Sequence, residues 1–411
     1  MSDSGSLPLA LIANARMPSQ RAQSLQVLQV AAAFARAGTP TTLLHARRFP
    51  TPSLPAGTDL FEYYGLGPGP RPKVEAVPCL DWIDRVPTRF QYVPARAQEL
   101  TFARNAARHV QRSMPSCRVL SREAESARAL LAGKRPHSKV YVEVHRVPGG
   151  RTRKRWLLEV AAGARGLIAI SGGVRDDLIS LGIPGDEILV EHDGFEASRG
   201  AGSGREDARA KIGVTPDAKL VVYTGGLLDW KGVDLLVDAA RELPELTFVI
   251  AGGMDADVAK LRSRYASNRS SGAPDNVRLD GFVAPKDIRD YLSAADLGIV
   301  PNRSKPAISA KYTSPLKVFE AMDAGLPLVM SDLPSLRDIL DDTEACYFAA
   351  DDAAALGRAI AKVMGDGALR ASMSSKMKAR AKNHSWDARA KRILDWMDKR
   401  ETMKPGNRGA A

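Results

Sequence analysis

The chain has 411 residues, of which 44% are hydrophobic and 26% charged, and a formal net charge of +12. This composition excludes a disordered or low-complexity chain, because the apolar residues suffice to build cores, and the length predicts two or three domains. Three scattered cysteines, Cys79, Cys117 and Cys346, exclude a disulfide framework and a cysteine zinc site and favour a cytoplasmic protein. Since no apolar run of about 18 residues and no secretory signal pattern is present, we expect neither a membrane-spanning helix nor export.

The first half of the chain alternates apolar strands with amphipathic helices. It predicts strands at 8–14, 41–46, 117–122, 139–145, 166–171 and 187–194, and helices at 24–38, 123–133, 151–163 and 172–183. Such alternation is typical of a parallel sheet with helices on both faces. The polar, glycine-rich stretch 197–207 then predicts a linker or surface loop.

The second half repeats this pattern. It predicts strands at 219–226, 246–253, 277–283, 297–301 and 326–331, and helices at 231–244, 256–267, 285–295, 315–325, 333–340 and 385–400. We therefore expect an α/β protein of two doubly wound, Rossmann-like domains, residues 1–196 and 207–384. We also expect them to face each other across a cleft at the carboxyl ends of their strands.

Positive charge is concentrated at residues 101–155, which hold 14 Lys and Arg residues but only three acidic ones. The densest run is Arg151, Arg153, Lys154 and Arg155, and Trp156 follows it. A cationic face attracts phosphates or acidic lipid head groups, and the tryptophan is consistent with an interfacial anchor. A plain solvated helix face is the alternative; no nucleic-acid partner is expected, because no DNA- or RNA-binding motif accompanies the charge.

Two segments of the second half combine glycine turns, helix starts and lysines. In GGLLDWKG (225–232), Lys231 stands at the mouth of a helix; in SPLKVFEAMDAG (314–325), Ser314 is a suitable N-cap before Pro315. Helix N-termini bind phosphate through free amides, and a nearby lysine adds a point charge. The alternatives are an ordinary solvated lysine and a plain amphipathic helix, since neither segment is a P-loop or a G-x-G-x-x-G turn.

Together these segments resemble the family 4 (group 1) glycosyltransferases, which have the GT-B fold. The order GGLLDWKG, AGG, GFV, AADLGIVP and SPLKVFEAMDAG resembles their C-terminal domain. VYVEVH, which ends in His145, and IAISGGVRDDL resemble landmarks of their N-terminal domain. The resemblance implies a glycosyltransferase that moves a sugar from a UDP- or GDP-linked donor to a glycan or lipid-linked acceptor, as in polysaccharide biosynthesis, with helix 385–400 packing back on the first domain.

Roles for single residues follow from this resemblance. It implies catalytic roles for His145, Lys231 and Lys317, and cleft positions for Arg122, Ser171 and Tyr312. Donor diphosphate binding falls to Gly225, Gly226, Lys231, Ser314, Leu316 and Lys317. Glu320 would hold the ribose, and Gly281, Phe282 and Val283 would frame the nucleobase. For His145 alone, an interior strand-end histidine is the alternative.

The chain departs from the family pattern at three places, one of which is the N-terminal loop, where residues 21–24 (RAQS) stand instead of a Gly-Gly pair. Tyr312 stands where the first glutamate of the E-x7-E motif is expected, and Gly226 stands where arginine is usual. The second cation for the diphosphate must therefore come from elsewhere, with Lys317 or Arg122 as candidates. The resemblance implies transfer with retention of configuration, in which fixed positive charge on the leaving diphosphate makes a metal ion or other cofactor unnecessary.

Two other classes of function stay open. One is a different enzyme of this architecture, such as a nucleotide-sugar epimerase; a nicotinamide-dependent enzyme is disfavoured by the missing G-x-G-x-x-G. The other is a non-catalytic module whose basic 101–155 face binds a membrane or polyanion. The preferred prediction is a cytoplasmic transferase, with the cytosolic membrane face as a possible peripheral location.

Overall fold

The computed structural model describes residues 7–132, 137–197, 203–266 and 274–402, so the expected linker 197–207 lies partly outside the described residues. The chain divides into two compact units, each described by itself. Unit 1 comprises Met1–Glu62, Pro68–Glu191 and Trp386–Ala411; unit 2 comprises Tyr63–Gly67 and His192–Ser385. The division near residue 191 falls slightly before the domain end at 196 expected from the sequence.

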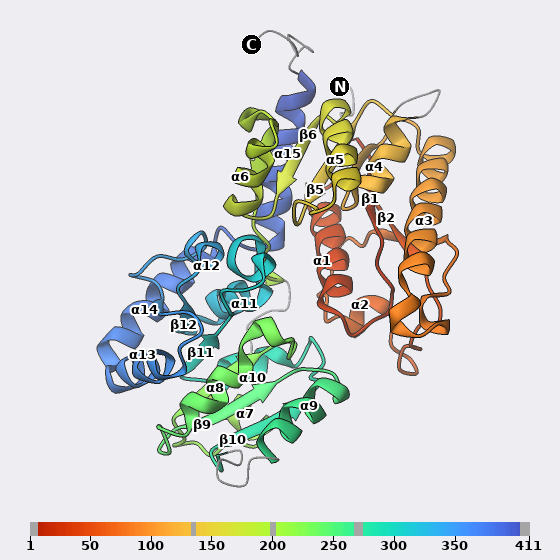
Figure 1. Cartoon of the computed structure of the whole chain (residues 1–411). Helices are drawn as coiled ribbons and strands as arrows, with labels where there is room; N and C mark the ends of the chain where they lie inside the picture. The colour runs from red at the N-terminus through yellow and green to blue at the C-terminus, as the bar shows by residue number, and fades with distance from the viewer. Residues whose placement is uncertain (1–6, 133–136, 198–202, 267–273, 403–411) are drawn as a thin grey trace. The chain divides into compact units, whose positions relative to one another are not determined.

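Unit 1 is built on a seven-stranded parallel sheet of order β3-β2-β1-β4-β5-β6-β7 (Figure 1). Its strands are β1 (Leu9–Ala13), β2 (Thr41–Arg47), β3 (Lys73–Pro78), β4 (Arg118–Ser121), β5 (Val140–Val144), β6 (Gly166–Ala169) and β7 (Ile188–Val190). Its α-helices are α1 (Ala22–Arg36), α2 (Leu60–Tyr63, at the boundary of the units), α3 (Tyr92–Ser113), α4 (Ala124–Leu131), α5 (Arg151–Gly163), α6 (Gly172–Ser180) and α15 (Trp386–Thr402). The chain reverses its winding direction between β1 and β4, which makes the sheet doubly wound.

The C-terminal helix α15 is part of unit 1, although the whole of unit 2 separates it in sequence from the rest of that unit (Figure 1). It packs against α1, where the indole of Trp386 donates a hydrogen bond of 2.9 Å to the side-chain oxygen of Gln29. Farther along, Arg389 forms a buried ion pair of 2.7 Å with Glu143 on β5. These contacts tie the helix to the sheet by both apolar packing and charge.

Unit 2 is built on a six-stranded parallel sheet of order β10-β9-β8-β11-β12-β13. Its strands are β8 (Leu220–Thr224), β9 (Thr247–Ala251), β10 (Val277–Gly281), β11 (Leu297–Val300), β12 (Leu328–Ser331) and β13 (Cys346–Phe348). Its α-helices are α7 (Arg205–Lys211), α8 (Val233–Ala240), α9 (Asp255–Ala266), α10 (Ile288–Ala294), α11 (Leu316–Ala324), α12 (Pro334–Arg337), α13 (Ala353–Gly365) and α14 (Gly367–Ala381). Here the winding reverses between β8 and β11, so both expected doubly wound sheets are present.

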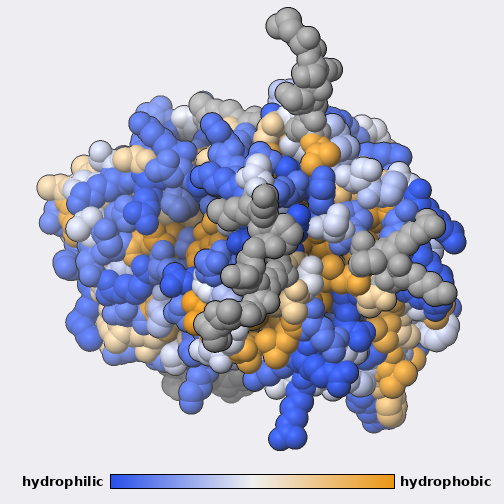
Figure 2. All heavy atoms as spheres, turned by 90° about the horizontal axis from the view of Figure 1, so that it is seen from above, coloured by the Kyte–Doolittle hydropathy of each residue, from blue (hydrophilic) through white to orange (hydrophobic). Residues whose placement is uncertain are grey.

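Both faces of the second sheet are covered, as the continuous apolar strands require. Val222 belongs to the core under α11, with Val318 and Phe319. Its neighbours Val221 and Tyr223 belong to the other core, because successive side chains of a strand point to opposite faces. On the face of the molecule seen in Figure 2, hydrophilic residues predominate and hydrophobic ones lie among them in patches.

The structure corrects several expectations about elements. The sequence analysis predicts no element between residues 47 and 116, where the structure has β3 and the long helix α3. Four further elements of the structure were not predicted: α7, β13, α13 and α14. The helix expected from residue 231 begins only at Val233, because Gly232 takes a left-handed conformation. The helix expected at 333–340 is only the four residues of α12, with turns after it.

Candidate functional site

Three strand-end turns of unit 2 stack on one another at the carboxyl edge of the sheet. The N–H of Gly225 donates to the carbonyl of Ala251 (2.9 Å), and that of Gly252 to the carbonyl of Gly281 (2.6 Å). A Cβ on Gly252 would lie 2.2 Å from the Gly225 carbonyl oxygen, so only glycine permits this approach. The predicted residues Gly225, Gly226 and Gly281 therefore belong to one layer of turns that follow β8, β9 and β10.

Lys231 lies in a 3-10 turn, Asp229–Lys231, just before α8. Gly232 follows with φ +66°, and a Cβ there would lie 1.9 Å from the carbonyl oxygen of Pro301, beyond the end of β11. The Lys231 ammonium stands 4.0 Å from the ring centroid of Trp230. Burial lowers the pKa of Lys231 to about 8, so the environment favours loss of its charge unless an anion is present.

The start of α11 differs from the expected capping arrangement. The N-cap is Pro315, without a side-chain cap, and Ser314 is not the cap: its hydroxyl accepts a 2.8 Å hydrogen bond from the N–H of Asp193. The first amides of a helix have no intrahelical partner, which leaves those of Leu316 and Lys317 available. Ser314 thus anchors the chain that leads into the helix.

Lys317 is the most unusual group of unit 2. Its residue is buried, and its Nζ has no hydrogen-bond partner among the described residues but stands 3.5 Å from the ring centroid of Tyr223. Burial holds its pKa well below 10.5, the charge of Lys231 lowers it further, and the Glu320 carboxylate opposes both effects. The three predicted residues Lys231, Lys317 and Glu320 therefore share one electrostatic environment.

A small pocket lies beside this group, at the point where the winding of the sheet reverses. Thr224 of β8, Val300 of β11, and Lys317 and Ala321 of α11 contribute to its lining. Doubly wound sheets bind ligands at the carboxyl ends of strands at such a reversal. In the described part of unit 2, the Lys317 side chain therefore lies at this reversal of the sheet.

The remaining predicted residues of unit 2 lie near this edge. Gly281 ends β10 with φ +72°, Phe282 after it is 37% exposed, and Val283 is half-buried. Tyr312 ends a π-helical turn, Ile308–Tyr312, shortly before α11, and is half-buried. Whether these residues contact a ligand stays a prediction.

In unit 1, Arg122 and His145 lie together at the ends of β4 and β5. The Nε2 of His145 is 2.7 Å from Nη2 of Arg122 and 2.7 Å from Oε1 of Glu143. Arg122 also donates to Gln26 (2.9 Å), and its Nη1 is buried without a hydrogen-bond partner in the described chain. Burial would raise the pKa of Glu143, but the charge of Arg389 and the His145 hydrogen bond hold it well below its usual value.

Glu143 was not predicted as a site residue. A glutamate inside the apolar strand VYVEVH is the signal that could have identified it, since buried charges need partners. Ser171, by contrast, has a structural contact: its hydroxyl accepts from the N–H of Val174 and caps α6. In the described residues, no group of three or more His, Cys, Asp and Glu residues is arranged to hold a metal ion.

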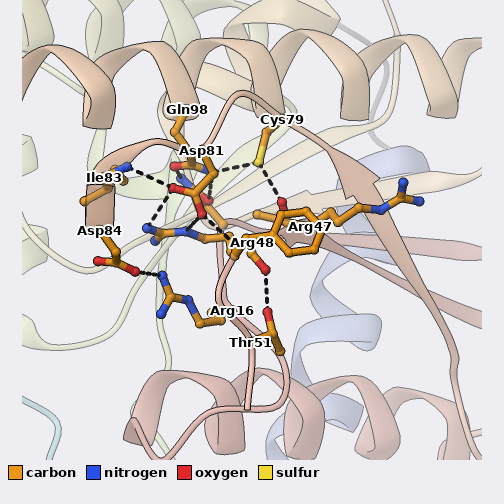
Figure 3. Close-up of polar contacts among 12 residues, drawn as sticks. Arg16, Arg47, Arg48, Thr51, Cys79, Asp81, Ile83, Asp84 and Gln98 are labelled. Carbon is orange, nitrogen blue, oxygen red and sulfur yellow. Dashed lines mark hydrogen bonds and ion pairs between the residues drawn. The ribbon is translucent and has the colours of Figure 1, made fainter. Parts of the chain in front are cut away.

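A second polar network of unit 1 fixes the loops after β2 and β3 (Figure 3). Asp81 accepts hydrogen bonds from the Arg48 guanidinium (3.0 Å) and from the N–H of Phe49 (3.1 Å). Asp84 pairs with Arg16, which lies in the loop between β1 and α1. Burial would raise the pKa of Asp81, but the Arg48 and Phe49 hydrogen bonds lower it, so the ionised carboxylate holds both loops together.

The two doubly wound parallel sheets fit the GT-B fold, which is also the fold of the solved structures described below. Residues 218–366 match the family "Glycosyl transferases group 1". The resemblance inferred from the motifs is therefore confirmed, and the family match itself lies within unit 2.

Relatives and solved structures agree with this assignment. The D-inositol 3-phosphate glycosyltransferase of Xylanimonas cellulosilytica is 26% identical over 58% of this chain and 57% of its own length. The alpha-galactosylglucosyldiacylglycerol synthase of Streptococcus pneumoniae is 22% identical over 61% of this chain and 65% of its own length. The alignment thus spans less than two thirds of either relative.

Among solved structures, Anabaena HepE in complex with UDP is similar, with a TM-score of 0.72, 16% identity, and coverage of 96% of this chain and 100% of that chain. Sucrose-phosphate synthase from Thermosynechococcus elongatus has a TM-score of 0.73 at 18% identity, with coverage of 96% and 98%. At this identity the likeness shows the shared GT-B fold.

Proposed function

We propose that this protein is a glycosyltransferase that transfers a sugar from a nucleotide diphosphate to an acceptor. The observation that carries the proposal is the buried Lys317 ammonium, which has no hydrogen-bond partner in the described chain and lies beside the glycine turn after β8. Burial lowers the pKa of the Lys317 amine, and a bound anion would favour its protonated, charged form. A diphosphate held by Lys231, Lys317 and the amides of Leu316 and Lys317 would be such an anion.

The proposed donor is a UDP-sugar. Solved structures with this fold are complexes of HepE with UDP and with UDP-glucose, which supports uridine over the GDP alternative. The proposal assigns the ribose to Glu320, one turn beyond Lys317 on α11, and the base to Gly281, Phe282 and Val283. The exposed ring of Phe282 suits stacking on a base.

The chemistry follows from the charges. Cleavage of the bond between the anomeric carbon and the diphosphate places negative charge on the leaving group, and Lys231 and Lys317 stabilise it as it forms. In the proposed reaction the leaving phosphate takes the acceptor's proton and the anomeric configuration is retained. With two lysines in this role, no metal is required. His145 and Arg122 of unit 1 are proposed to serve the sugar and the acceptor.

Nucleotide binding tests the donor assignment. Isothermal titration with UDP, GDP and ADP should show binding of UDP by the wild type, with at least tenfold weaker binding for Lys231→Met and Lys317→Met. Lys211→Met is the matched control, because Lys211 is an exposed lysine of unit 2 paired with Asp290. Absence of binding to every nucleotide would refute the proposal and favour a non-catalytic module. Conversion of a UDP-sugar to its epimer, without transfer or hydrolysis, would favour the epimerase alternative.

The acceptor is proposed to be lipid-linked, with unit 1 on an anionic membrane surface. One relative is named for an inositol phosphate and another for a diacylglycerol, which supports an anionic or lipid acceptor. In the described residues, no helix has the length and hydropathy needed to cross a bilayer. A peripheral contact on the cytoplasmic side is therefore the proposed mode of association.

The basic run proposed from the sequence is engaged in internal contacts. Arg153 pairs with Glu99 (3.2 Å) and Arg155 with Glu159 (2.9 Å); both glutamates lie outside the 101–155 window. The Trp156 ring centroid lies 5.4 Å from the guanidinium carbon of Arg96, so this tryptophan packs against a neighbouring helix.

A better candidate surface lies in segment 82–93, which follows β3 and includes the first two residues of α3. Trp82, Phe90, Tyr92 and Val93 are exposed by 49%, 58%, 75% and 71%. The segment also exposes its two arginines, 85 and 89, and the Asp81 network of Figure 3 fixes the loop in front of it. Exposed aromatic residues beside arginines suit an anionic lipid interface.

Vesicle sedimentation distinguishes the two surfaces. The double variant Trp82→Ser, Phe90→Ser should bind phosphatidylglycerol vesicles several-fold more weakly, whereas Leu228→Ser, at an exposed leucine of unit 2, should bind like the wild type. If charge reversal of Arg151, Arg153 and Arg155 abolishes vesicle binding and the aromatic variant does not, the assignment to segment 82–93 is wrong.

A further inference from the structure

Tyr223 contacts both parts of the proposed diphosphate site. It is the fourth residue of β8, it is fully buried, and burial raises the pKa of its hydroxyl, which therefore stays protonated. The hydroxyl donates a 2.7 Å hydrogen bond to the carbonyl oxygen of Gly226 and so fixes the turn after the strand. The ring lies under the Lys317 ammonium, with 3.5 Å between Nζ and the ring centroid.

The surroundings of Gly225 show how close the tip of the Lys317 side chain lies to the turn after β8. A Cβ on Gly225 would lie 3.3 Å from both Cε and Nζ of Lys317 and 3.8 Å from the Tyr223 hydroxyl oxygen. The lysine tip thus lies close to the turn formed by Gly225 and Gly226. Nζ has no hydrogen-bond partner among the described residues, and it lies against the face of the Tyr223 ring.

We propose that Tyr223 is a positioning residue, which holds the Lys317 ammonium against the Gly225–Gly226 turn so that this lysine acts with Lys231 on a bound diphosphate. The inference rests on the proposed function, since it concerns the same ligand. Its physical basis is the attraction between a cation and the face of an aromatic ring, which strengthens when both are desolvated. The hydroxyl contributes separately by holding the turn through Gly226.

The inference predicts that replacing Tyr223 weakens binding of the nucleotide diphosphate but not of the nucleoside. Tyr223→Leu should weaken UDP binding about tenfold, which corresponds to ~1.4 kcal/mol, and leave uridine binding within about twofold. Tyr223→Phe keeps the ring and should retain most of the UDP affinity. A merely structural role would weaken uridine and UDP alike. In a Lys317→Met background, Tyr223→Leu should cause no further loss, because the two side chains act as one unit.

Tyr347 on β13 provides a matched control in the same sheet. Its hydroxyl also donates to backbone carbonyls, those of Leu336 and Leu340, and the Arg337 guanidinium carbon lies 3.7 Å from its ring centroid. Tyr347→Leu should leave the ratio of UDP to uridine affinity unchanged.

A second measurement avoids any dependence on the folding of the leucine variant. Phenylalanine with one, two or three ring fluorines at position 223 keeps the shape of the ring but progressively removes the negative potential of its face. UDP affinity should fall stepwise along this series. A flat series, or an equal loss for uridine, overturns the role of Tyr223 while nucleotide binding by the wild type still supports the transferase. If the wild type binds none of UDP, GDP and ADP, both proposals fail.

Discussion

Replacement of Lys231 by methionine should make the unliganded protein more stable and less able to bind a nucleotide. Burial lowers the pKa of Lys231 from 10.5 to about 8, which corresponds to roughly 3 kcal/mol of unfavourable free energy in the folded state at neutral pH. Methionine has a similar shape without the charge. It forfeits the contact with the Trp230 ring, worth about 0.5–2 kcal/mol.

The net gain in the free energy of unfolding is therefore about 1–2 kcal/mol at pH 7. For a unit of this size, that corresponds to a rise of about 2–8 °C in melting temperature. The stability difference between Lys231→Met and the wild type depends on pH. Because the folded-state pKa lies below the unfolded one, the penalty is complete below pH 8 and disappears above about pH 10.4, so the advantage of Lys231→Met should vanish there.

Thermal melts of wild type and Lys231→Met at pH 7 and pH 10.5, with and without UDP, test this reasoning. At pH 7 the variant should melt higher without ligand, and UDP should raise the melting temperature of the wild type more than that of the variant. Lys211→Met replaces an exposed lysine and should melt like the wild type, both with and without UDP. A variant that melts lower at pH 7, or whose advantage is the same at both pH values, would contradict the unfavourable desolvation of the Lys231 ammonium.

Three further expectations concern single positions. Gly232→Ala should destabilise unit 2 by more than ~2 kcal/mol in urea titrations, because the left-handed backbone and the Pro301 carbonyl 1.9 Å from the new Cβ both oppose it. Glu143→Gln removes the carboxylate charge from a buried ion pair with Arg389 and should cost unit 1 about 3–5 kcal/mol in the same assay. Burial raises the pKa of Glu123 to about 7, so the wild type should lose stability relative to Glu123→Gln as the pH rises from 5 to 8 in thermal melts; an equal difference at both ends would contradict this assignment.

Most strands and helices of the structure were predictable from local periodicity, and the failures have physical reasons. Helix α3 does carry the helical signal, since its buried residues Phe102, Ala106 and Val110 recur every fourth position. The surrounding prolines and exposed apolar residues obscured it. Strand β13 has only three residues, too few for any period to be read. The prediction that Ser314 caps α11 was wrong. Its hydroxyl accepts a hydrogen bond from the N–H of Asp193, which is distant in sequence, and so does not cap the helix.

By itself the sequence determined the alternation of strands and helices, the two doubly wound sheets and the motifs with Lys231, Lys317 and Glu320. These features are local, because they depend on residues a few positions apart. Only the tertiary structure decided which groups meet: the Tyr223 ring under the Lys317 ammonium, and Glu143 paired with Arg389 far along the chain. Such contacts depend on strand order and packing across the sheet, which no spacing within one segment specifies.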